Sequence, residues 1–362
     1  MSRKRPDFVK NWRALEAPAA PPGATEDFGQ ASELADAAGL THLRVAHLRI
    51  APGLRAYPPL AMRDVEVFAF VLEGMPDLWV DGHLHQLETG DGVCLNAGTG
   101  IAHCLINNTR SDARVFVFSQ AMRRNEKVVQ PLDPATNENL KTMGMLWADA
   151  PSRKRGPNGG KPGDKAGSRR GKPEFVVHWR DILDKKPRRY PDSDEDQSIE
   201  AMLGRRARFS RIGIHLEVLK PGRRTSWPHA ERDEEEFVYV VSGQVEAWND
   251  GYTTPLAEGD FIGWRAGTGI THVILNNSVE DAVLLVGGEA SRVRNQFWYP
   301  FHPTRNKEVG ALYWADHPKP KLGPHDGMPD ALRARVPAAK RRNAVSANEA
   351  ARYLGPRKTK KK

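Results

Sequence analysis

The chain has 362 residues and a formal net charge of +9, with 54 Lys and Arg against 45 Asp and Glu. The basic excess lies in two segments: residues 153–172 hold eight basic and one acidic residue, and residues 330–362 hold eleven and two. The rest of the chain is therefore net acidic. This argues against a basic nucleic-acid-binding face on a folded domain and leaves only weak contacts through the tail.

The length, the apolar pattern and the cysteine count argue against a membrane-spanning, secreted or disulfide-rich protein. A chain of 362 residues suggests two domains of ordinary size. No run approaches 18 apolar residues, so no membrane span is predicted, and no apolar stretch of a secretory signal follows the basic N-terminus. Cys94 and Cys104 are too few for a disulfide scaffold and fit a reducing compartment. We therefore expect a cytoplasmic protein.

The chain repeats itself along its length. The segment RPDFVKNWR at 5–13 returns as KPEFVVHWR at 172–180, and LWADAP at 146–151 returns as YWADHP at 313–318, both with an offset of 167. Between them, AGTGIAHCLINN at 97–108 matches AGTGITHVILNN at 266–277 with an offset of 169. This period is too long for a solenoid and indicates two copies of one domain.

Each copy has the pattern of short β-strands. Apolar and polar residues alternate in LRVAHLRIAPG from 43 and in IGIHLEVLKPG from 212, and both runs end at Pro-Gly. Asp-Gly pairs at 81–82 and 250–251 predict hairpin turns. Many short strands with Gly-rich turns indicate an all-β sandwich or barrel.

These patterns divide the chain into four segments. We predict a first barrel with an N-terminal arm at 1–149 and an exposed, flexible, basic Gly-rich linker at 150–171. A second barrel follows at 172–329, and a basic tail at 330–362.

Two motifs of the second copy resemble those of the cupin family. They are GRRTSWPHAERDEEEFVYVVSG at 222–243 and GDFIGWRAGTGITHVILN at 259–276. The family motifs read G-x5-HxH-x3/4-E-x6-G and G-x5-PxG-x2-H-x3-N. Their three histidines and one glutamate typically hold one metal inside a jelly-roll β-barrel. The resemblance implies an all-β bicupin, with tandem cupin domains related by internal duplication.

The resemblance also implies a metal site. His229, Glu236 and His272 stand at ligand positions, and Glu231 replaces the second histidine of the motif. These four residues would hold one divalent transition metal, and their ligand types do not choose among Fe, Mn, Zn and Ni. Arg265 replaces the motif proline and is predicted to orient an anionic substrate group. The alternatives are a solvated acidic turn for the run ERDEEE and a surface arginine for Arg265.

The first copy lacks this polar set. Subtracting 169 places Leu60, Met62 and Val67 where the second copy has His229, Glu231 and Glu236. Only His272 keeps a partner, His103, so we predict a metal-free first barrel. The pair His83 and His85 follows the Asp-Gly turn and is predicted to face solvent rather than a metal.

Two function classes remain open. The first is a metal-dependent enzyme acting on a small, anionic substrate in the second barrel, of the dioxygenase (oxidoreductase), decarboxylase or isomerase type by family resemblance. The second is a non-catalytic small-ligand-binding or sensing bicupin whose basic tail contacts a partner or nucleic acid. The resemblance further implies two barrels about a pseudo-twofold axis, as a monomer or a homodimer.

Overall fold

A computed structural model describes residues 5–20, 25–122, 126–164, 170–191, 193–290 and 295–335. The chain forms two compact units. The first barrel comprises Asn11–Ile182 with Leu203–Gly213. The second comprises the residues up to Lys10, Leu183–Met202 and those from Ile214 onward. This division differs from the predicted linear boundaries because each barrel takes in an arm from elsewhere in the chain. The predicted tail beyond residue 335 lies outside the described residues.

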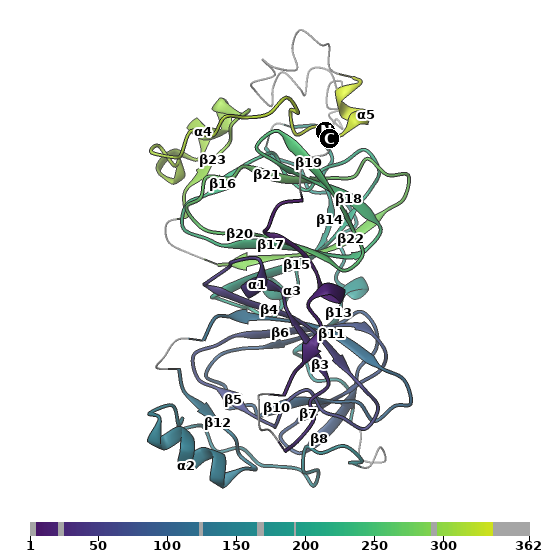
Figure 1. The fold of residues 1–362 in the computed structure, drawn as a ribbon, viewed down its shortest axis with the longest axis vertical. Helices are drawn as coiled ribbons and strands as arrows, with labels where there is room; N and C mark the ends of the chain where they lie inside the picture. The colour runs from purple at the N-terminus through teal and green to yellow at the C-terminus, as the bar shows by residue number, and fades with distance from the viewer. Residues whose placement is uncertain are drawn as a thin grey trace, which may run out of the picture. The chain divides into compact units, whose positions relative to one another are not determined.

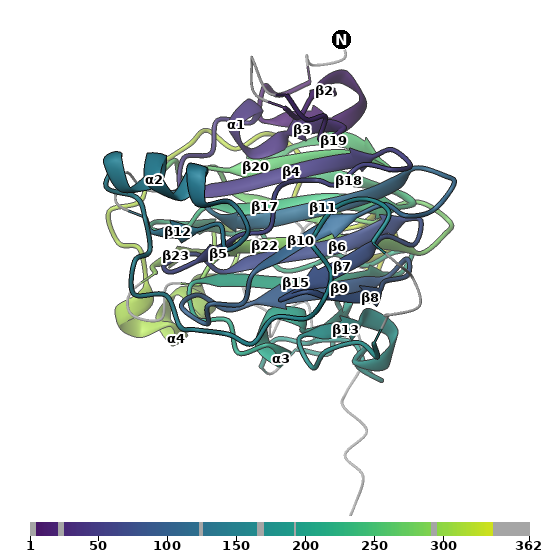
Figure 2. The ribbon, with the colours of Figure 1, turned by 90° about the horizontal axis from the view of Figure 1, so that it is seen from below.

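The first barrel consists of three antiparallel sheets among its described residues (Figures 1 and 2). Neighbouring strands of the largest sheet are, in order, β13 (Val176–His178), β9 (Asp91–Leu95), β6 (Val67–Glu73), β11 (Ala113–Gln120), β4 (Leu43–Ile50), β3 (Gln30–Glu33) and β2 (Ala17–Pro18). The two smaller sheets are β10 (His103–Ile106), β7 (Asp77–Val80) and β8 (His83–Gln86), and β12 (Val128–Val129) with β5 (Ala61–Met62).

The second barrel repeats this plan in its described residues. Its largest sheet runs β1 (Val9–Asn11), β20 (Asp260–Trp264), β17 (Glu236–Ser242), β22 (Ala282–Glu289), β15 (Ile212–Leu219) and β14 (Ile199–Ala201). The smaller sheets are β19 (Tyr252–Ala257), β18 (Gln244–Asn249) and β21 (His272–Leu275), and β16 (Ala230–Glu231) with β23 (Phe297–Trp298). The prediction of a duplicated all-β fold is confirmed.

Helices are short and lie outside the barrel strands. They are α1 (Leu34–Ala37), α2 (Pro134–Thr142), α3 (Leu203–Arg206), α4 (Pro303–Glu308) and α5 (Asp330–Arg333), with 3₁₀ turns η1 (Trp12–Ala14), η3 (Trp179–Asp181) and η4 (Gly310–Leu312). In the part of the chain that is described, no helix is both long and apolar enough to span a membrane.

The two Asp-Gly pairs form the predicted hairpin turns. Asp81 and Gly82 have φ values of 46° and 87° and join β7 to β8. Asp250 and Gly251 have φ values of 46° and 88° and join β18 to β19. Positive φ at both central residues is the geometry of a type I′ turn, which matches the twist of antiparallel strands. The same turn in both copies gives both hairpins the same register.

The segment predicted as a free linker is held to the first barrel over its described part. Gly156 N–H donates to Asp81 O at 2.7 Å, and the Trp79 indole N–H donates to the carbonyl of Asn158 at 2.9 Å. The Arg55 guanidinium donates to Gly160 O at 2.7 Å. Residues 151–164 are largely exposed, but these bonds tie the segment to the barrel at several points. Residues 165–169 lie outside the described residues.

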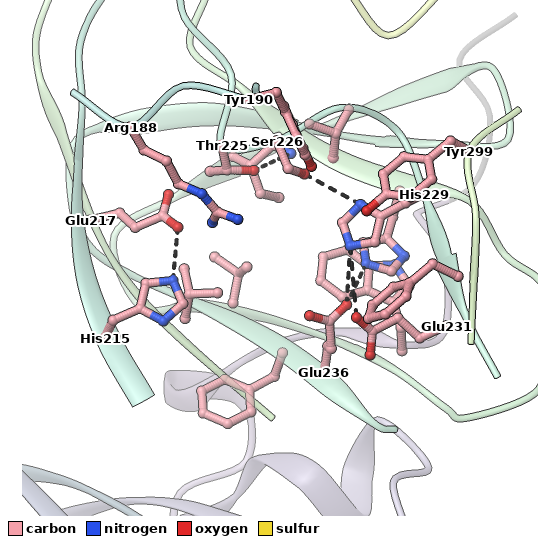
Figure 3. Close-up of a pocket in the computed structure, with 18 of the residues that line it drawn as sticks. Arg188, Tyr190, His215, Glu217, Thr225, Ser226, His229, Glu231, Glu236 and Tyr299 are labelled. Atoms are coloured by element: carbon pink, nitrogen blue, oxygen red, sulfur yellow. Dashed lines mark hydrogen bonds and ion pairs between the residues drawn. The ribbon is translucent and has the colours of Figure 1, made fainter. Parts of the chain in front are cut away.

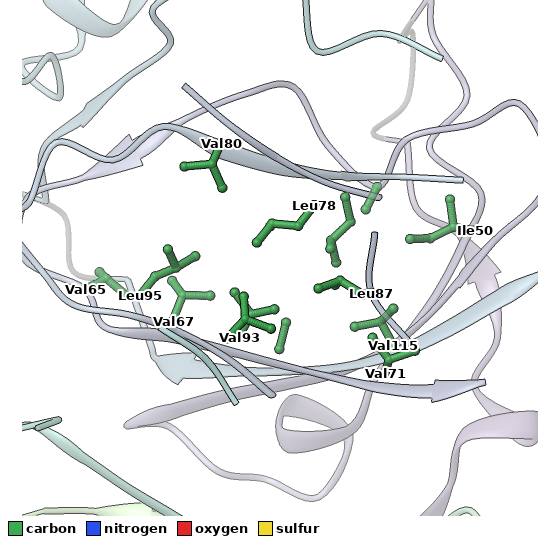
Figure 4. Close-up of a cluster of buried hydrophobic side chains, with 14 residues drawn as sticks. Ile50, Val65, Val67, Val71, Leu78, Val80, Leu87, Val93, Leu95 and Val115 are labelled. Carbon is green, nitrogen blue, oxygen red and sulfur yellow. The ribbon is translucent and has the colours of Figure 1, made fainter. Parts of the chain in front are cut away.

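The interior of the first barrel is filled by apolar side chains (Figure 4). Its buried cluster includes Ile50, Val65, Val67, Val71, Leu78, Val80, Leu87, Val93, Leu95 and Val115. These residues come from alternating positions of strands, so their side chains converge on one face of each sheet. The second barrel has an apolar cluster of its own, around Val238, Val240, Ile262, Ile274 and Leu284. Polar side chains share its interior.

Candidate metal centre

Three strands of the second barrel bring two histidines and a glutamate together. His229 precedes β16, Glu236 begins β17 and His272 begins β21. His229 and His272 face each other across an antiparallel bridge, with N–H to O distances of 3.2 Å and 2.8 Å. Because paired residues on neighbouring strands point to the same face, both imidazoles enter the barrel. Among the described residues, this group has one ligand atom from each side chain within 4.8 Å of the others.

The donor atoms are spaced as ligands of one metal ion would be. Glu236 Oε2 lies 2.9 Å from His272 Nε2. It lies 3.7 Å from His229 Nε2, and Figure 3 shows the side chains of His229 and Glu236 directed toward each other. Two ligand atoms bound at about 2.1 Å and at a right angle are about 3.0 Å apart. The set of two imidazoles and one carboxylate is a common one for divalent transition metals. The spacing of Glu236 and His272 matches this value, and His229 lies somewhat farther from Glu236, so the group suits such an ion.

Backbone carbonyls select the tautomer of both histidines. His229 Nδ1 lies 2.9 Å from Trp227 O, and His272 Nδ1 lies 3.1 Å from Ile270 O. A carbonyl can only accept a hydrogen bond, so each Nδ1 carries a hydrogen and, in the neutral imidazole, each Nε2 keeps its lone pair for a ligand bond. The Trp264 ring stacks on His272 with centroids 3.9 Å apart and fixes the plane of that imidazole.

Electrostatics place the triad in a state that can bind metal. Burial by itself would raise the pKa of Glu236, but contacts with His229 and His272 outweigh it and lower the pKa of this carboxyl. Burial also lowers the pKa of His272. The ionised carboxylate of Glu236 and the Nε2 lone pairs of the two imidazoles are the forms that bind a metal ion. A cation at this point would therefore displace any proton that Glu236 shares with a histidine.

Glu231 lies beside the triad rather than within it. Its Oε1 is 4.0 Å from His229 Nε2, and its Oε2 accepts a hydrogen bond from Asn295 at 2.8 Å. Burial, together with the charges of Glu236 and Glu234, raises the pKa of Glu231 well above its usual value. The structure thus brings three of the four predicted ligands to one point and places the fourth next to them.

The triad lines one side of a cavity of about 310 Å³ in the second barrel. Arg265 is exposed and is not part of the cavity lining, because it follows the end of β20. The structure therefore does not bring Arg265 to the triad as the sequence led us to expect. Arg188 and Arg305 line the cavity instead.

His215 and Glu217 also line this cavity, and the sequence analysis did not identify them. Ile212, Ile214 and Leu216 alternate with them on β15 and are buried on the other face of the strand. A signal was present: the offset of 169 places Ala46 and Leu48 where the second copy has His215 and Glu217. These are the same apolar-to-polar exchanges that single out the triad.

The first barrel has a different interior at the matching positions. His103 is 4% exposed, and burial lowers its pKa to about 4. Its strand partners are Val80 and Leu60, and its ring meets the edge of Tyr57. Both potential metal groups found in the described residues belong to the second barrel. His85 is also buried: its Nδ1 lies 2.7 Å from Gly171 O. The expectation that it faces solvent is therefore wrong, because residues 170–171 cover it.

Comparison with known proteins agrees with this architecture. A family model described as a cupin domain matches residues 46–119 and again residues 215–288. The chain is a bicupin of the cupin superfamily. The two matches begin at equivalent positions, Ala46 in β4 and His215 in β15. The family prediction is thus confirmed on both copies.

Solved structures similar to this bicupin include two oxalate decarboxylases. The formate complex of the Lactobacillus farciminis enzyme has a TM-score of 0.53 and 15% identity, covering 85% of this chain and 91% of that chain. A Bacillus subtilis oxalate decarboxylase with Mn(II) centres has a TM-score of 0.51 and 14% identity, covering 81% and 80%. At this identity the likeness concerns the fold. A search of curated proteins found no match.

Proposed function

We propose that this bicupin is a metal-dependent enzyme that acts on a small organic acid at one divalent ion in the second barrel. The observation that carries the proposal is the convergence of His229, Glu236 and His272 within 4.8 Å at a cavity. The first barrel has the same fold and positions Leu60 and Val67 there. Folding therefore does not demand the polar set, and a chemical role explains it better.

His229, Glu236 and His272 would hold the ion, with Glu231 adjacent as a fourth ligand. Three or four protein ligands leave coordination positions open for a substrate. When bound, such an ion would supply Lewis-acid chemistry at a carboxylate or carbonyl oxygen. The chain itself orients the two Nε2 atoms through the carbonyls of Trp227 and Ile270.

Decarboxylation is the leading reaction class. The similar structures are named as oxalate decarboxylases, one with Mn(II) and one with formate. An oxygenase or isomerase has no comparable support among them. The cavity of about 310 Å³ equals the liquid volume of about ten water molecules, so it admits acids larger than oxalate.

The test begins with metal analysis of untagged protein and compares two matched variants. His272→Ala removes a proposed ligand, and His103→Ala removes its equivalent in the first barrel. We expect about one equivalent of a divalent transition metal in the wild type and in His103→Ala, and a large loss in His272→Ala. Equal metal content in both variants would contradict the proposed site.

Turnover is then measured as CO₂ release from a panel of small organic acids, with and without oxygen. Release that needs metal but not net oxygen consumption supports a decarboxylase. Oxygen consumption in proportion to substrate would instead indicate an oxygenase. A protein that binds metal and ligand without turnover would be a binding or sensing bicupin, which is the second class that the sequence left open.

A further inference from the structure

A second polar group faces the triad across the same cavity. Arg188, His215 and Glu217 line it, and none of them belongs to the candidate metal centre. Figure 3 shows the Arg188 guanidinium directed into the space between the His215–Glu217 pair and the side chains of His229 and Glu236. The cavity therefore has two chemically distinct walls.

The backbone of Arg188 is hydrogen-bonded to residues 197–198, which lead into β14. Its backbone N–H donates to Ser198 O at 2.8 Å, and its own carbonyl accepts from Gln197 N–H at 3.0 Å. The side chain is about half exposed (48%), and its Nη1 donates to Glu200 Oε1 at 3.2 Å. Because Glu200 lies on β14, this ion pair fixes the direction of the guanidinium.

Most of the hydrogen-bonding capacity of Arg188 is unused within the described part of the chain. A guanidinium carries five N–H donors in a planar fork, and the bond to Glu200 engages one of them. The remaining donors can bind a carboxylate through two parallel bonds, the strong and directional mode of arginine recognition. Such a fork at a cavity is a site for an anionic group.

His215 and Glu217 support this wall. His215 Nε2 lies 2.9 Å from Glu217 Oε1. Burial opposes protonation of His215, but the hydrogen bond to Glu217 and the charges of Glu217 and Glu200 raise its pKa. Glu217 is 2% exposed, and its Oε2 has no hydrogen-bond partner among the described residues. A buried acceptor without a partner is costly, and a donor on a bound ligand would satisfy it.

A second metal ion fits this wall less well. Glu200, His215 and Glu217 do offer ligand atoms within 4.8 Å of one another. However, Arg188 already provides the positive charge beside Glu200 and would repel a divalent ion. Glu200 pairs with Arg188 and Glu217 Oε1 pairs with His215, while Arg188 keeps donors for an anionic group, so this wall favours a carboxylate over a metal ion.

We propose that Arg188, positioned by Glu200 and flanked by His215, binds the carboxylate of a two-ended substrate whose other end reaches the metal centre. The proposal rests on the proposed function for its metal-binding end only. It narrows the substrate class to organic acids with a carboxylate set apart from the reacting group. A hydroxyl or amino group on the ligand would donate to Glu217 Oε2.

The test measures the binding of paired probes to Mn(II)-reconstituted protein by calorimetry. The probes are succinate, glutarate and adipate, each compared with its monomethyl ester, which has nearly the same length and one charge fewer. We expect at least one diacid to bind roughly 10- to 100-fold more tightly than its ester, as a hydrogen-bonded charge pair provides. In Arg188→Met this preference falls to near one, while the ester still binds.

Two further proteins make the result decisive. Arg189→Met removes the neighbouring arginine, which pairs with Asp196 at 2.6 Å and does not line the cavity, and it should keep the preference. The double variant Arg188→Gln/Glu200→Gln removes both partners of the ion pair, so it loses the preference without leaving an unpaired carboxylate. A diacid preference that persists in both Arg188 variants overturns the proposal, as does the absence of any diacid preference in the wild type.

The same series separates this proposal from the proposed function. His272→Ala should weaken the metal-dependent binding of diacid and ester alike. If the wild type holds no metal, the proposed function fails. The diacid preference can still be measured on that metal-free protein, and only its dependence on Arg188 decides the present inference.

Discussion

A buried ion pair in the second barrel, here called the clasp, joins Glu195 to Arg224. The first barrel has an equivalent but more exposed pair, which serves as a control. Arg224 and Glu195 form two hydrogen bonds, of 2.6 Å and 2.8 Å, and are 1% and 7% exposed. Their equivalents at an offset of 169, Arg55 and Glu26, form two bonds of 2.6 Å. Glu26, however, has a side chain that is 39% exposed. The two pairs thus share geometry and differ in burial.

We predict that Glu195→Gln destabilises the protein far more than Glu26→Gln. Removing the carboxylate of Glu195 leaves the Arg224 guanidinium buried without a counter-charge, which costs about 3–5 kcal/mol of unfolding free energy. Water can reach the Glu26 side of the other pair, although the Arg55 side chain is only 9% exposed, so we expect Glu26→Gln to cost less, about 1–2 kcal/mol. The arm at Gly327 also depends on the clasp, because its carbonyl accepts from Arg224 Nη1 at 2.9 Å.

Hydrogen exchange of metal-free protein measures this difference by segment. Glu195→Gln should speed exchange in residues 222–231 strongly. Glu26→Gln should speed exchange only slightly in residues 53–62, the matching segment of the first barrel. Urea unfolding of both variants gives the total loss of stability. Equal losses, or a larger loss for Glu26→Gln, would refute the argument that burial sets the strength of the clasp.

Three other predictions concern the cavity. Glu236→Gln should destabilise the metal-free protein by about 1–3 kcal/mol near neutral pH, as measured by urea unfolding. Because the pKa of Glu236 is lowered in the folded protein, this loss of stability should shrink as the pH falls below the usual glutamate value of 4.5. Glu231→Gln should have the opposite effect and stabilise the metal-free protein at neutral pH by roughly 1 kcal/mol or more, because the pKa of Glu231 is raised in the folded protein. The same variant should bind metal more weakly in a metal titration. An unchanged metal affinity would exclude Glu231 as a ligand. Arg188→Met should raise the KM for an acidic substrate at least tenfold, whereas a larger effect of Arg265→Met would restore the role predicted for Arg265 from sequence.

Much of the fold could be predicted because its signals are local. The Asp-Gly turns, the alternating strands and the duplicated segments each act over a few residues. The segments that pack against each barrel from elsewhere in the chain could not be predicted in the same way. Residues 156–160 look like a flexible linker by composition, yet they bond to the barrel through backbone groups that any sequence carries. Composition alone does not reveal such bonds.

The site was only partly predictable for a related reason. Motif spacing identified His229, Glu236 and His272 because neighbouring strands keep a fixed register. Arg265 was expected at the cavity because it replaces a motif residue, but its position after the end of β20 leaves it exposed. Arg188 reaches the cavity from the segment before β14, where no motif marks it.

Comparing the two barrels separates residues that maintain the fold from residues that carry chemistry. The clasp arginines, the hairpin turns and the tryptophans that bind the arms occur in both copies, so the fold needs them. The interior positions 215, 217, 229 and 236 are polar in the second copy, whereas 46, 48, 60 and 67 are Ala, Leu, Leu and Val in the first. Burying four such polar side chains is costly unless something pairs with them. Because one barrel folds without them, their cost in the other is best explained by bound ligands, a metal at one wall and a carboxylate at the other.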